Sequence, residues 1–453
     1  MRNTMQRIIG ALTAAMLVSS GGTSNAAATG YAPMDVAALL TAAHGAPPMI
    51  CALAARSVRN YGWGNSGEAP STPLGAAAMV INRDNGDTQL PQADVDRLFT
   101  ALASDDACVR ELSVRMLGNQ RADAVASAFV TRLASPDAAM REVAAFGLGM
   151  TQPKTAIDPL IGALRDATPG VRANSAWALG RIDHGRALQP LVGLFRDNSE
   201  MVREASVLAA GRIDSASSIP ALLRVLQNDE SPRVRRVAAW ALGQRGAREA
   251  TDALGGALSK ESDPRVREMI AWALGNSRGK SGAEALGTAL RRDSDDDVRE
   301  TAAWALAETG DRTAVDALGN AIENDKSSRV RGTAAWAIGQ LAGHGTKAPA
   351  GLLRALKDEN DDTRLRAAWA LGQLGDAGMT SEINNALKAE KSDQVRKALI
   401  RALIKSGGRS EETLTELLKS SDATVRESAV RGLVGSNSFN PWPWPQPRPR
   451  PFP

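Results

Sequence analysis

Two hydrophobic patterns alternate along most of the chain, and each has the spacing of an amphipathic helix. The first occurs in 156–166, AIDPLIGALRD, whose apolar residues recur three and four positions apart: Ile157, Leu160, Ile161 and Leu164. The second occurs in 234–243, VRRVAAWALG, whose apolar residues fall at i, i+3, i+4, i+7 and i+8: Val234, Val237, Ala238, Ala241 and Leu242. Each segment is therefore predicted to be a helix with one buried face.

The second pattern recurs at a nearly constant period. It opens on a Val-Arg dipeptide or a close variant, which begins at Val109, Met140, Val171, Val202, Val234, Val266, Val298, Val330, Thr363, Val395 and Val425. Successive copies are 30 to 33 residues apart. Eleven copies at so regular a period predict an array of one helical hairpin, because stacked neighbours bury the apolar faces that a single hairpin exposes.

Polar residues and glycines mark the two ends of the second helix. Acidic residues precede it at Asp229, Asp263, Asp293–Asp297 and Asp358–Asp362. We expect them to cap free N–H groups at the positive end of the helix dipole. A glycine follows the last apolar residue, and we expect it to end the helix: Gly118, Gly149, Gly180, Gly211, Gly243, Gly275, Gly339 and Gly372.

The acidic turn, Val-Arg, Ala-Ala and Leu-Gly at fixed offsets resemble HEAT repeats, specifically the PBS-lyase HEAT-like type, over about 95–436. The resemblance implies an all-α fold, a right-handed α-solenoid (superhelix) of about eleven helical-hairpin repeats. It also implies that the second helices line the concave side. The fold is a general binding scaffold, so the resemblance alone does not identify a function.

Both ends of the chain depart from the repeat. Residues 1–28 have a basic start, an apolar run of 11 residues and small residues up to Ala26 and Ala28, which is typical of a signal peptide; an uncleaved anchor is the alternative. Residues 29–94 are predicted to be an N-terminal helical cap with a Gly/Pro-rich loop, before the HEAT-like array in 95–436. Residues 437–453 form a Pro/Trp/Arg-rich tail, predicted to be extended.

The chain has two cysteines, Cys51 and Cys108. We expect an exported protein, periplasmic or secreted, and in such a compartment an even pair favours a disulfide. The bond would tie the predicted cap to the first repeat. The alternative is a pair of small buried thiols.

The formal net charge is +4. Arg2 and Arg7 of the leader and Arg448 and Arg450 of the tail account for that excess, so the array itself is nearly neutral. A nucleic-acid binder needs a concentrated basic stripe, and we therefore expect no nucleic-acid partner.

Six of the nine tryptophans share one position, six residues after the Val: Trp177, Trp240, Trp272, Trp304, Trp336 and Trp369. On a helical wheel this slot lies roughly 130° from the apolar face. Two interpretations stay open. The tryptophans could form an aromatic ladder that binds a partner, flanked by Arg236, Glu268 and Glu300 of the same helices. Alternatively, each could pack on the neighbouring repeat and stiffen the array.

The Arg after the Val recurs in all eleven copies. It could pair with an acidic group of its own or the adjacent turn, for example Arg235 with Asp229 or Arg299 with Asp293. A basic track for phosphate is the alternative, but the abundant Asp at the same helix end favours ion pairing, because phosphate binding needs unpaired positive charge.

Signatures of catalysis are weak. His44, His184 and His344 lie in separate turns, none precedes a Glu, and no CxxC or HExxH is present. The His-Glu pairs of hydroxylases built on HEAT repeats are therefore missing. The acidic residues Asp293–Asp297 lack the glycine and distal glutamate of a Ca²⁺ loop. We expect no catalytic residue, metal or cofactor, although the array also resembles the phycobilin lyases that name this repeat type.

The tail contains its own candidate motif: Trp442, Trp444, Arg448, Arg450 and Phe452. Alternating prolines favour polyproline II. The tail could be passive and disordered, could dock into an aromatic-lined groove, or could touch lipid headgroups.

Taken together, these patterns predict a non-catalytic exported scaffold or adaptor that binds a protein or peptide on the concave face. We expect a monomer with no transmembrane segment in the mature chain. An enzyme or enzyme-associated subunit of the lyase or hydroxylase kind, and surface association through the tail, are the alternatives.

Overall fold

The computed structural model describes residues 35–47, 51, 90–120, 123–213, 216–244, 246, 248–277, 282–341, 343 and 347–406, with scattered positions between 415 and 430. The predicted signal peptide, most of the predicted N-terminal cap and the whole tail, with its Trp442, Trp444, Arg448, Arg450 and Phe452, lie outside these residues.

Every regular element in the described ranges is a helix, which confirms the predicted all-α solenoid class. Contacts between residues divide the chain into two compact units, of which the first comprises 1–225 and 229–241 and the second 226–228 and 242–450. We call them unit 1 and unit 2. The division falls within α13 (Pro232–Gln244), and the preceding α12 spans Ile219–Asn228.

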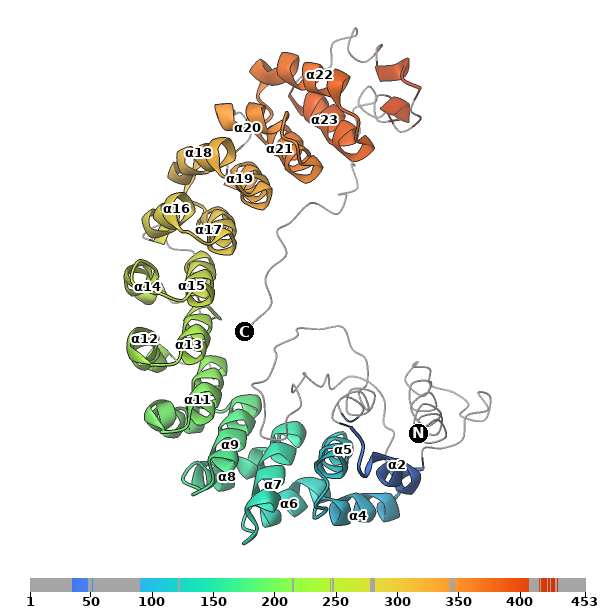
Figure 1. Cartoon of the computed structure of the whole chain (residues 1–453), viewed down its shortest axis with the longest axis vertical. Coiled ribbons are helices and arrows are strands. Elements are labelled where there is room, and N and C mark those ends of the chain that lie inside the picture. Colours follow the sequence, from blue (N-terminus) through green and yellow to red (C-terminus); the bar gives the residue numbers. More distant parts are fainter. Residues whose placement is uncertain are drawn as a thin grey trace. The chain divides into compact units, whose positions relative to one another are not determined.

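In each unit the first helices of the hairpins form one row and the second helices another (Figure 1). The first-helix row of unit 1 consists of α4 (Gln92–Ala101), α6 (Asp123–Arg132), α8 (Ile157–Ala163) and α10 (Leu188–Gly193), and α2 (Val36–Ala43) precedes them. Its second-helix row contains α5 (Ala107–Gly118), α7 (Ala138–Thr151), α9 (Pro169–Ile182) and α11 (Glu200–Arg212).

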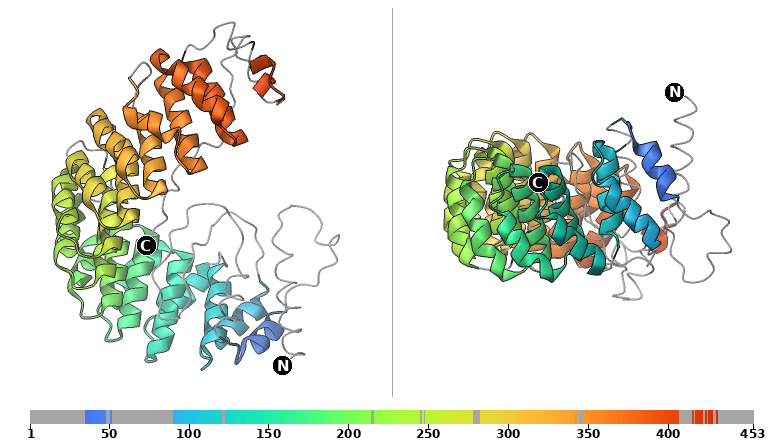
Figure 2. Two further views of the ribbon diagram at one scale, coloured as in Figure 1. Left: turned by 45° about the horizontal axis from the view of Figure 1, so that its top comes forward. Right: turned by 90° about the horizontal axis from the view of Figure 1, so that it is seen from below.

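Unit 2 repeats this arrangement. Its first-helix row consists of α14 (Thr251–Leu258), α16 (Gly282–Arg292), α18 (Val315–Asn324), α20 (Ala350–Ala355) and α22 (Thr380–Ala389). Its second-helix row contains α15 (Pro264–Asn276), α17 (Asp296–Thr309), α19 (Ser328–Leu341), α21 (Asp361–Leu374) and α23 (Asp393–Lys405). Neighbouring second helices lie side by side and in contact along each unit (Figure 2).

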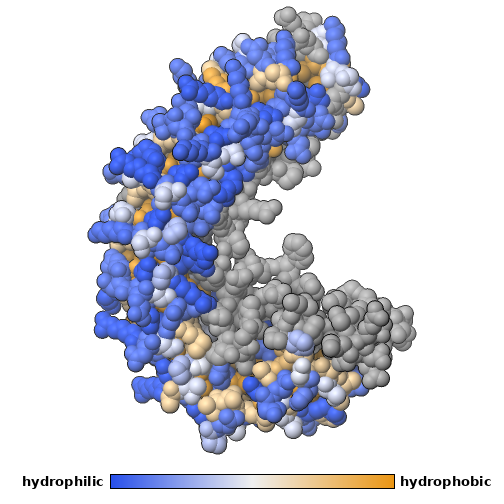
Figure 3. All heavy atoms as spheres, viewed as in Figure 1, coloured by the Kyte–Doolittle hydropathy of each residue, from blue (hydrophilic) through white to orange (hydrophobic). Residues whose placement is uncertain are grey.

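The core of each unit lies between its two rows. The Val that opens a second helix and the Leu eight residues later are fully buried, as at Val266 and Leu274 of α15 and at Val298 and Leu306 of α17. Hydrophilic side chains cover most of the visible surface, with hydrophobic residues showing in narrow strips between them (Figure 3). The predicted apolar face of the second helix is therefore confirmed.

The prediction that a glycine ends each second helix is wrong for most copies. Only α5 ends at its glycine, Gly118. The glycine lies one or two residues inside the helix at Gly149, Gly180, Gly211, Gly243, Gly275, Gly339 and Gly372.

These glycines allow close approach between neighbouring second helices. A Cβ placed on Gly180 would lie 2.6 Å from Cα of Ala209, and one on Gly243 would lie 2.8 Å from Cα of Ala273. Such distances leave no room for a methyl group. The glycine is therefore required by the next repeat's helix, which a single helical segment does not reveal.

The Arg after each Val forms a ladder between repeats. Its Nη1 donates to carbonyl oxygens of its own turn, as Arg299 does to Asp293 O at 3.0 Å. Its Nε and Nη2 donate to the carboxylate of the next repeat's turn, as Arg299 does to Asp325. Seven such pairs are described, with N–O distances of 2.6–2.9 Å: Arg141–Asp166, Arg172–Asp197, Arg203–Asp229, Arg267–Asp293, Arg299–Asp325, Arg331–Asp358 and Arg364–Glu390.

The ladder confirms that the arginines pair with acidic groups of the adjacent turn. The two pairs given as examples from the sequence, Arg235 with Asp229 and Arg299 with Asp293, are corrected. The carboxylates of Asp229 and Asp293 accept from Arg203 and Arg267 of the preceding repeats. Arg235 donates to the main-chain carbonyls of Asp229 and Glu230, at 2.9 and 3.2 Å.

Each ladder carboxylate also orders its own turn. Asp166 Oδ1 accepts from the backbone N–H of Thr168 at 2.8 Å while both of its oxygens accept from Arg141. The hydrogen bond from Arg141 holds the pKa of Asp166 below its ordinary value, against the opposing effect of burial. In some repeats a second polar side chain two residues further on caps the helix, as Asp295 does for α17 and Asn360 for α21, but Thr168 and Ser199 form no side-chain cap bond with α9 and α11. Of the acidic residues expected to cap, Asp263 and Asp295 do so, whereas Asp229, Asp293 and Asp358 bind ladder arginines.

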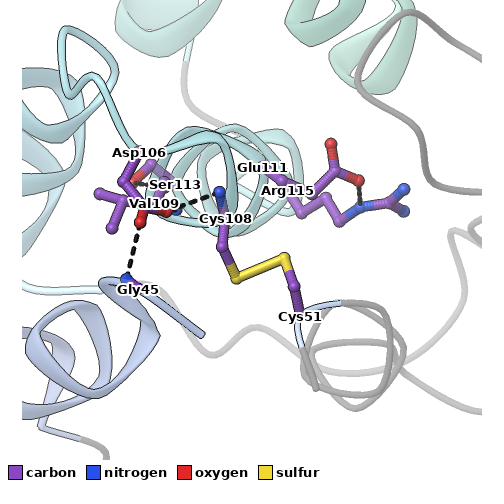
Figure 4. The surroundings of a disulfide bond; sticks show 8 residues. All are labelled: Gly45, Cys51, Asp106, Cys108, Val109, Glu111, Ser113 and Arg115. Atoms are coloured by element: carbon purple, nitrogen blue, oxygen red, sulfur yellow. Dashed lines mark hydrogen bonds and ion pairs between the residues drawn. A yellow bond between two sulfur atoms is a disulfide. The ribbon is translucent and has the colours of Figure 1, made fainter. Parts of the chain in front are cut away.

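The predicted disulfide between Cys51 and Cys108 is present, with the two Cα atoms 5.6 Å apart (Figure 4). Beside it, the backbone N–H of Gly45 donates to Oδ2 of Asp106 at 2.7 Å. Asp106 in turn caps α5 through the N–H groups of Cys108 and Val109. The segment after α2 is thus attached to the first hairpin by one covalent and one hydrogen bond.

Replacing Gly243 by Ala should destabilise unit 2 by about 1–3 kcal/mol, because the new methyl group would meet Ala273 and the Trp272 ring. Gly256 of α14 is the matched control, since a Cβ there meets nothing within 4 Å. Gly256→Ala should stabilise the helix by up to about 1 kcal/mol. Urea unfolding of the two variants measures the difference, and equal effects would show that the close approach is not a constraint.

Replacing Asp166 by Asn should lower the free energy of unfolding at pH 7 by about 1–3 kcal/mol, because the charge-assisted bonds to Arg141 are lost. The folded-state pKa of Asp166 is below its unfolded value, so the stabilisation is present above about pH 4 and disappears as the pH falls through the lower folded-state pKa. The difference between wild type and variant in acid titration should therefore close below about pH 4.

Asp158→Asn is the control for that measurement. Asp158 pairs with Arg186 at 2.8 Å, but both side chains are mostly exposed, so its loss should cost less than about 1 kcal/mol. A cost as large as that of Asp166→Asn would contradict a special role for the ladder.

Candidate functional site

The structure separates the six slot tryptophans into two groups. Four are nearly fully buried, with 4–8% of their surface exposed: Trp177, Trp240, Trp336 and Trp369. Trp272 of α15 and Trp304 of α17 are partly exposed. The expectation that the slot lies away from the packed interior is therefore wrong for the first four, whereas Trp272 and Trp304 are packed in part and exposed in part.

Burial of the slot comes from the preceding repeat. The ring edge of five of the six tryptophans lies over the glycine of the helix before it, so that a Cβ on Gly339 would be 2.5 Å from Cζ3 of Trp369. Trp336 is the exception, because the preceding helix α17 has Ala307 at that position. The corresponding separation is 2.6 Å between Gly243 and Trp272 and 3.3 Å between Gly275 and Trp304. In unit 1, Trp177 also stacks on Phe146 with ring centroids 5.0 Å apart. The slot tryptophans therefore pack on the neighbouring repeat. Trp272 and Trp304 do so too, but part of each ring stays exposed.

The two partly exposed tryptophans lie on adjacent, contacting helices, and each is flanked by polar residues four positions before and after it. Residues spaced four apart share one face of a helix. We call this face the Trp272–Trp304 surface, and it consists of Glu268, Trp272 and Asn276 on α15 and Glu300, Trp304 and Glu308 on α17. All six residues are partly exposed.

The carboxylates of this surface differ in their partners. Glu300 Oε2 lies 3.0 Å from Arg329 Nη1, and its Oε1 accepts from Thr333 Oγ1 at 3.4 Å. Glu268 Oε1 accepts from Thr301 Oγ1 at 3.5 Å. Glu308 has no ion pair or side-chain hydrogen bond to any described residue. Glu308 is therefore available to a cation from outside the helix row.

Arg329 borders the surface on α19. It contacts Asp296 and Asp297 at 2.7 and 2.8 Å, in addition to Glu300. These bonds raise its pKa above the ordinary arginine value, led by the hydrogen bond to Asp297. Three carboxylates therefore surround the single positive charge of Arg329, so that the net charge beside Trp304 stays negative.

Arg236, the third predicted flanking residue, is partly exposed on α13 but belongs to unit 1, whereas Glu268 and Glu300 belong to unit 2. The same position carries Glu142 and Glu204 in unit 1, which sequence reasoning did not single out. Burial raises the pKa of Glu142, and it raises that of Glu204 although Glu204 accepts from Arg233 at 2.8 Å. The position itself, two residues after the Val, was the signal that could have found them.

In the described part of the chain, no group of three or more His, Cys, Asp or Glu side chains could hold a metal ion. His44 and His184 lie on different hairpins, and His344 falls outside the described residues. Of the helices that the structure describes, none combines the length and the apolar character needed to cross a bilayer.

Comparison with known proteins agrees with this architecture. The family of HEAT repeats matches residues 93–173, 126–211, 157–242, 193–275, 219–300, 283–361 and 349–434. No curated protein matches the chain.

Solved structures of similar fold include importin β, with 13% identity, a TM-score of 0.56, and 94% of this chain and 63% of that one covered. Yeast importin β has 15% identity and a TM-score of 0.52, over 88% of this chain and 62% of its own. An engineered protein is 22% identical with a TM-score of 0.43, over 68% of this chain and 98% of that one. The chain spans less than two thirds of either importin, and the likeness concerns the fold alone. Since the family matches cover most of 93–434, the chain belongs to the family of HEAT repeats.

Proposed function

We propose that this chain is a non-catalytic, exported scaffold that binds a protein or peptide partner at the Trp272–Trp304 surface. The observation that carries the proposal is the partial exposure of two adjacent tryptophans, in a slot whose other tryptophans are buried. A large amphipathic side chain left partly exposed on a rigid scaffold is the kind of residue that dominates binding energy at interfaces.

The surroundings of the two rings support a partner with positive charge. Glu268 precedes Trp272 by one helical turn, and Glu300 and Glu308 flank Trp304. A partner segment with an apolar or proline ring beside a lysine or arginine would cover the indoles and pair with Glu308. Neighbouring second helices are held rigidly by the Arg ladder, so the surface is preformed.

Two features of the chain support export: its disulfide and its leader-like first residues. The Cys51–Cys108 disulfide closes 57 residues of chain, and such bonds persist in oxidising compartments. The leader-like residues 1–28 point the same way. Fractionation of the native cells, followed by N-terminal sequencing of the protein, tests this part of the proposal.

Replacing Trp272 and Trp304 together by Ala should weaken partner binding at least tenfold, because interface tryptophans commonly contribute 2 kcal/mol or more. The measurement is affinity capture from native extract, followed by titration of the captured partner with wild-type and variant chains. Because both rings also pack on the preceding helix, the variant should lose some stability, and binding is therefore compared per folded molecule.

Trp336→Ala with Trp369→Ala is the matched control. Both rings are at least 92% buried, so this pair should lose about 3–5 kcal/mol of stability per site through cavity formation while the remaining folded protein binds the partner normally. Equal loss of binding in the two double variants, or unchanged binding in Trp272→Ala/Trp304→Ala, would contradict the proposal.

A further inference from the structure

We propose that the chain's own C-terminal tail, residues 437–453, docks on the Trp272–Trp304 surface and competes there with the partner. The inference rests on the proposed function, because it uses the same surface. It adds that the tail of the same chain occupies that surface when no partner is bound.

The tail has the composition that the surface fits. It contributes Trp442, Trp444 and seven prolines, and no Asp or Glu follows Glu427 in the chain. Arg448 and Arg450 are its only charged side chains. Proline and indole rings pack on exposed indoles at little entropic cost, because polyproline II is extended before binding. An arginine can then pair with Glu308, which lacks an ion-pair partner among the described residues.

Among the second helices α15 to α23 of unit 2, only α15 and α17 carry a glutamate two residues after the Val, and only α17 adds a second one at Glu308. The position of Glu308 is taken by the neutral residues Gln340 on α19 and Gln373 on α21. The position of Trp304 is taken by buried tryptophans on α19 and α21 and by Arg401 on α23. Burial lowers the pKa of Arg401, which marks a partly desolvated cation. A basic tail is therefore disfavoured beside α23 and favoured at α15 and α17.

The chain after Val430 is comparable in length with the path to α17. Arg426 donates to the carbonyl of Ser420, six residues before it, as the Arg at the start of other second helices does. The helix of Arg426 is thus next in the row after α23, and α17 lies four helices away from it. At about 8–10 Å between packed helices the path is about 32–40 Å. Twelve residues separate Val430, the last described residue, from Trp442, and they span about 37 Å at 3.1 Å per residue.

Covalent cross-linking in the full chain tests the docking. Asn276→Cys on the surface, paired with Gln446→Cys in the tail, gives two thiols that a short bismaleimide can bridge, because the native cysteines are already bonded. Asn320→Cys with Gln446→Cys is the matched control, since Asn320 is exposed on α18 in the first-helix row. We expect intramolecular cross-linking of the first pair to be at least tenfold faster than that of the second.

Further variants establish that the docking is specific. Trp304→Ala, or Trp442→Ala with Trp444→Ala, should reduce cross-linking of the Asn276→Cys/Gln446→Cys chain to the rate of the control pair. Glu308→Gln should reduce it by a smaller factor and remove part of its dependence on salt concentration. Similar rates for the two cysteine pairs would overturn the proposal, because they would show that the tail samples both rows without preference. Cross-linked dimers in place of monomers would overturn it in favour of a second copy's tail.

This experiment needs no partner, so its failure is separate from that of the proposed function. Equal cross-linking rates together with loss of partner capture in Trp272→Ala/Trp304→Ala would reject the tail and retain the scaffold. Fast, specific cross-linking with no partner bound at these tryptophans would retain the tail as the occupant and reject the scaffold.

Discussion

The structure depends on the close approach of successive second helices. A glycine nine residues after the opening Val lets the next helix come within contact of its backbone, as Gly180 does for Ala209. That approach brings the Arg of one repeat to the acidic turn of the next, where it binds a carboxylate with two nitrogens and the local turn with a third. It also provides the depression into which the slot tryptophan fits. Each repeat is therefore completed by its neighbour, as expected for an array whose stability is a sum of repeat and interface contributions.

Features that belong to one hairpin could be predicted from the sequence. The apolar face around Val234 and Leu242, the period and the capping aspartates all follow from local spacing, and the two cysteines were correctly paired. Features that belong to the interface between repeats could not. A wheel for a single helix places Trp369 away from the core because it omits Gly339 of the preceding repeat. For the same reason, the sequence analysis took glycines inside the helices for helix ends. It also paired Asp293 with Arg299, whereas the structure pairs it with Arg267.

The structure reduces the number of candidate binding tryptophans from six to two. The sequence treats the slot as one repeated position, whereas burial distinguishes Trp272 and Trp304 from the rest. In the proposed scaffold, their carboxylate neighbours, and Glu308 in particular, would determine which chemistry the surface accepts. A proline-rich, basic segment would be favoured, and the chain carries one in residues 437–453. A scaffold whose own tail resembles its ligand would be regulated by competition, with an effective tail concentration that can reach millimolar values.

Hydroxyl-radical footprinting of the six slot tryptophans tests the distinction most directly. The Trp442→Ala/Trp444→Ala chain is the appropriate sample, because there the surface is free of any competing tail. We predict that Trp272 and Trp304 are oxidised several times faster than Trp177, Trp240, Trp336 and Trp369, as quantified for each residue by mass spectrometry. Uniform oxidation of all six residues, or slow oxidation of Trp272 and Trp304, would contradict the assignment of this surface as the binding site.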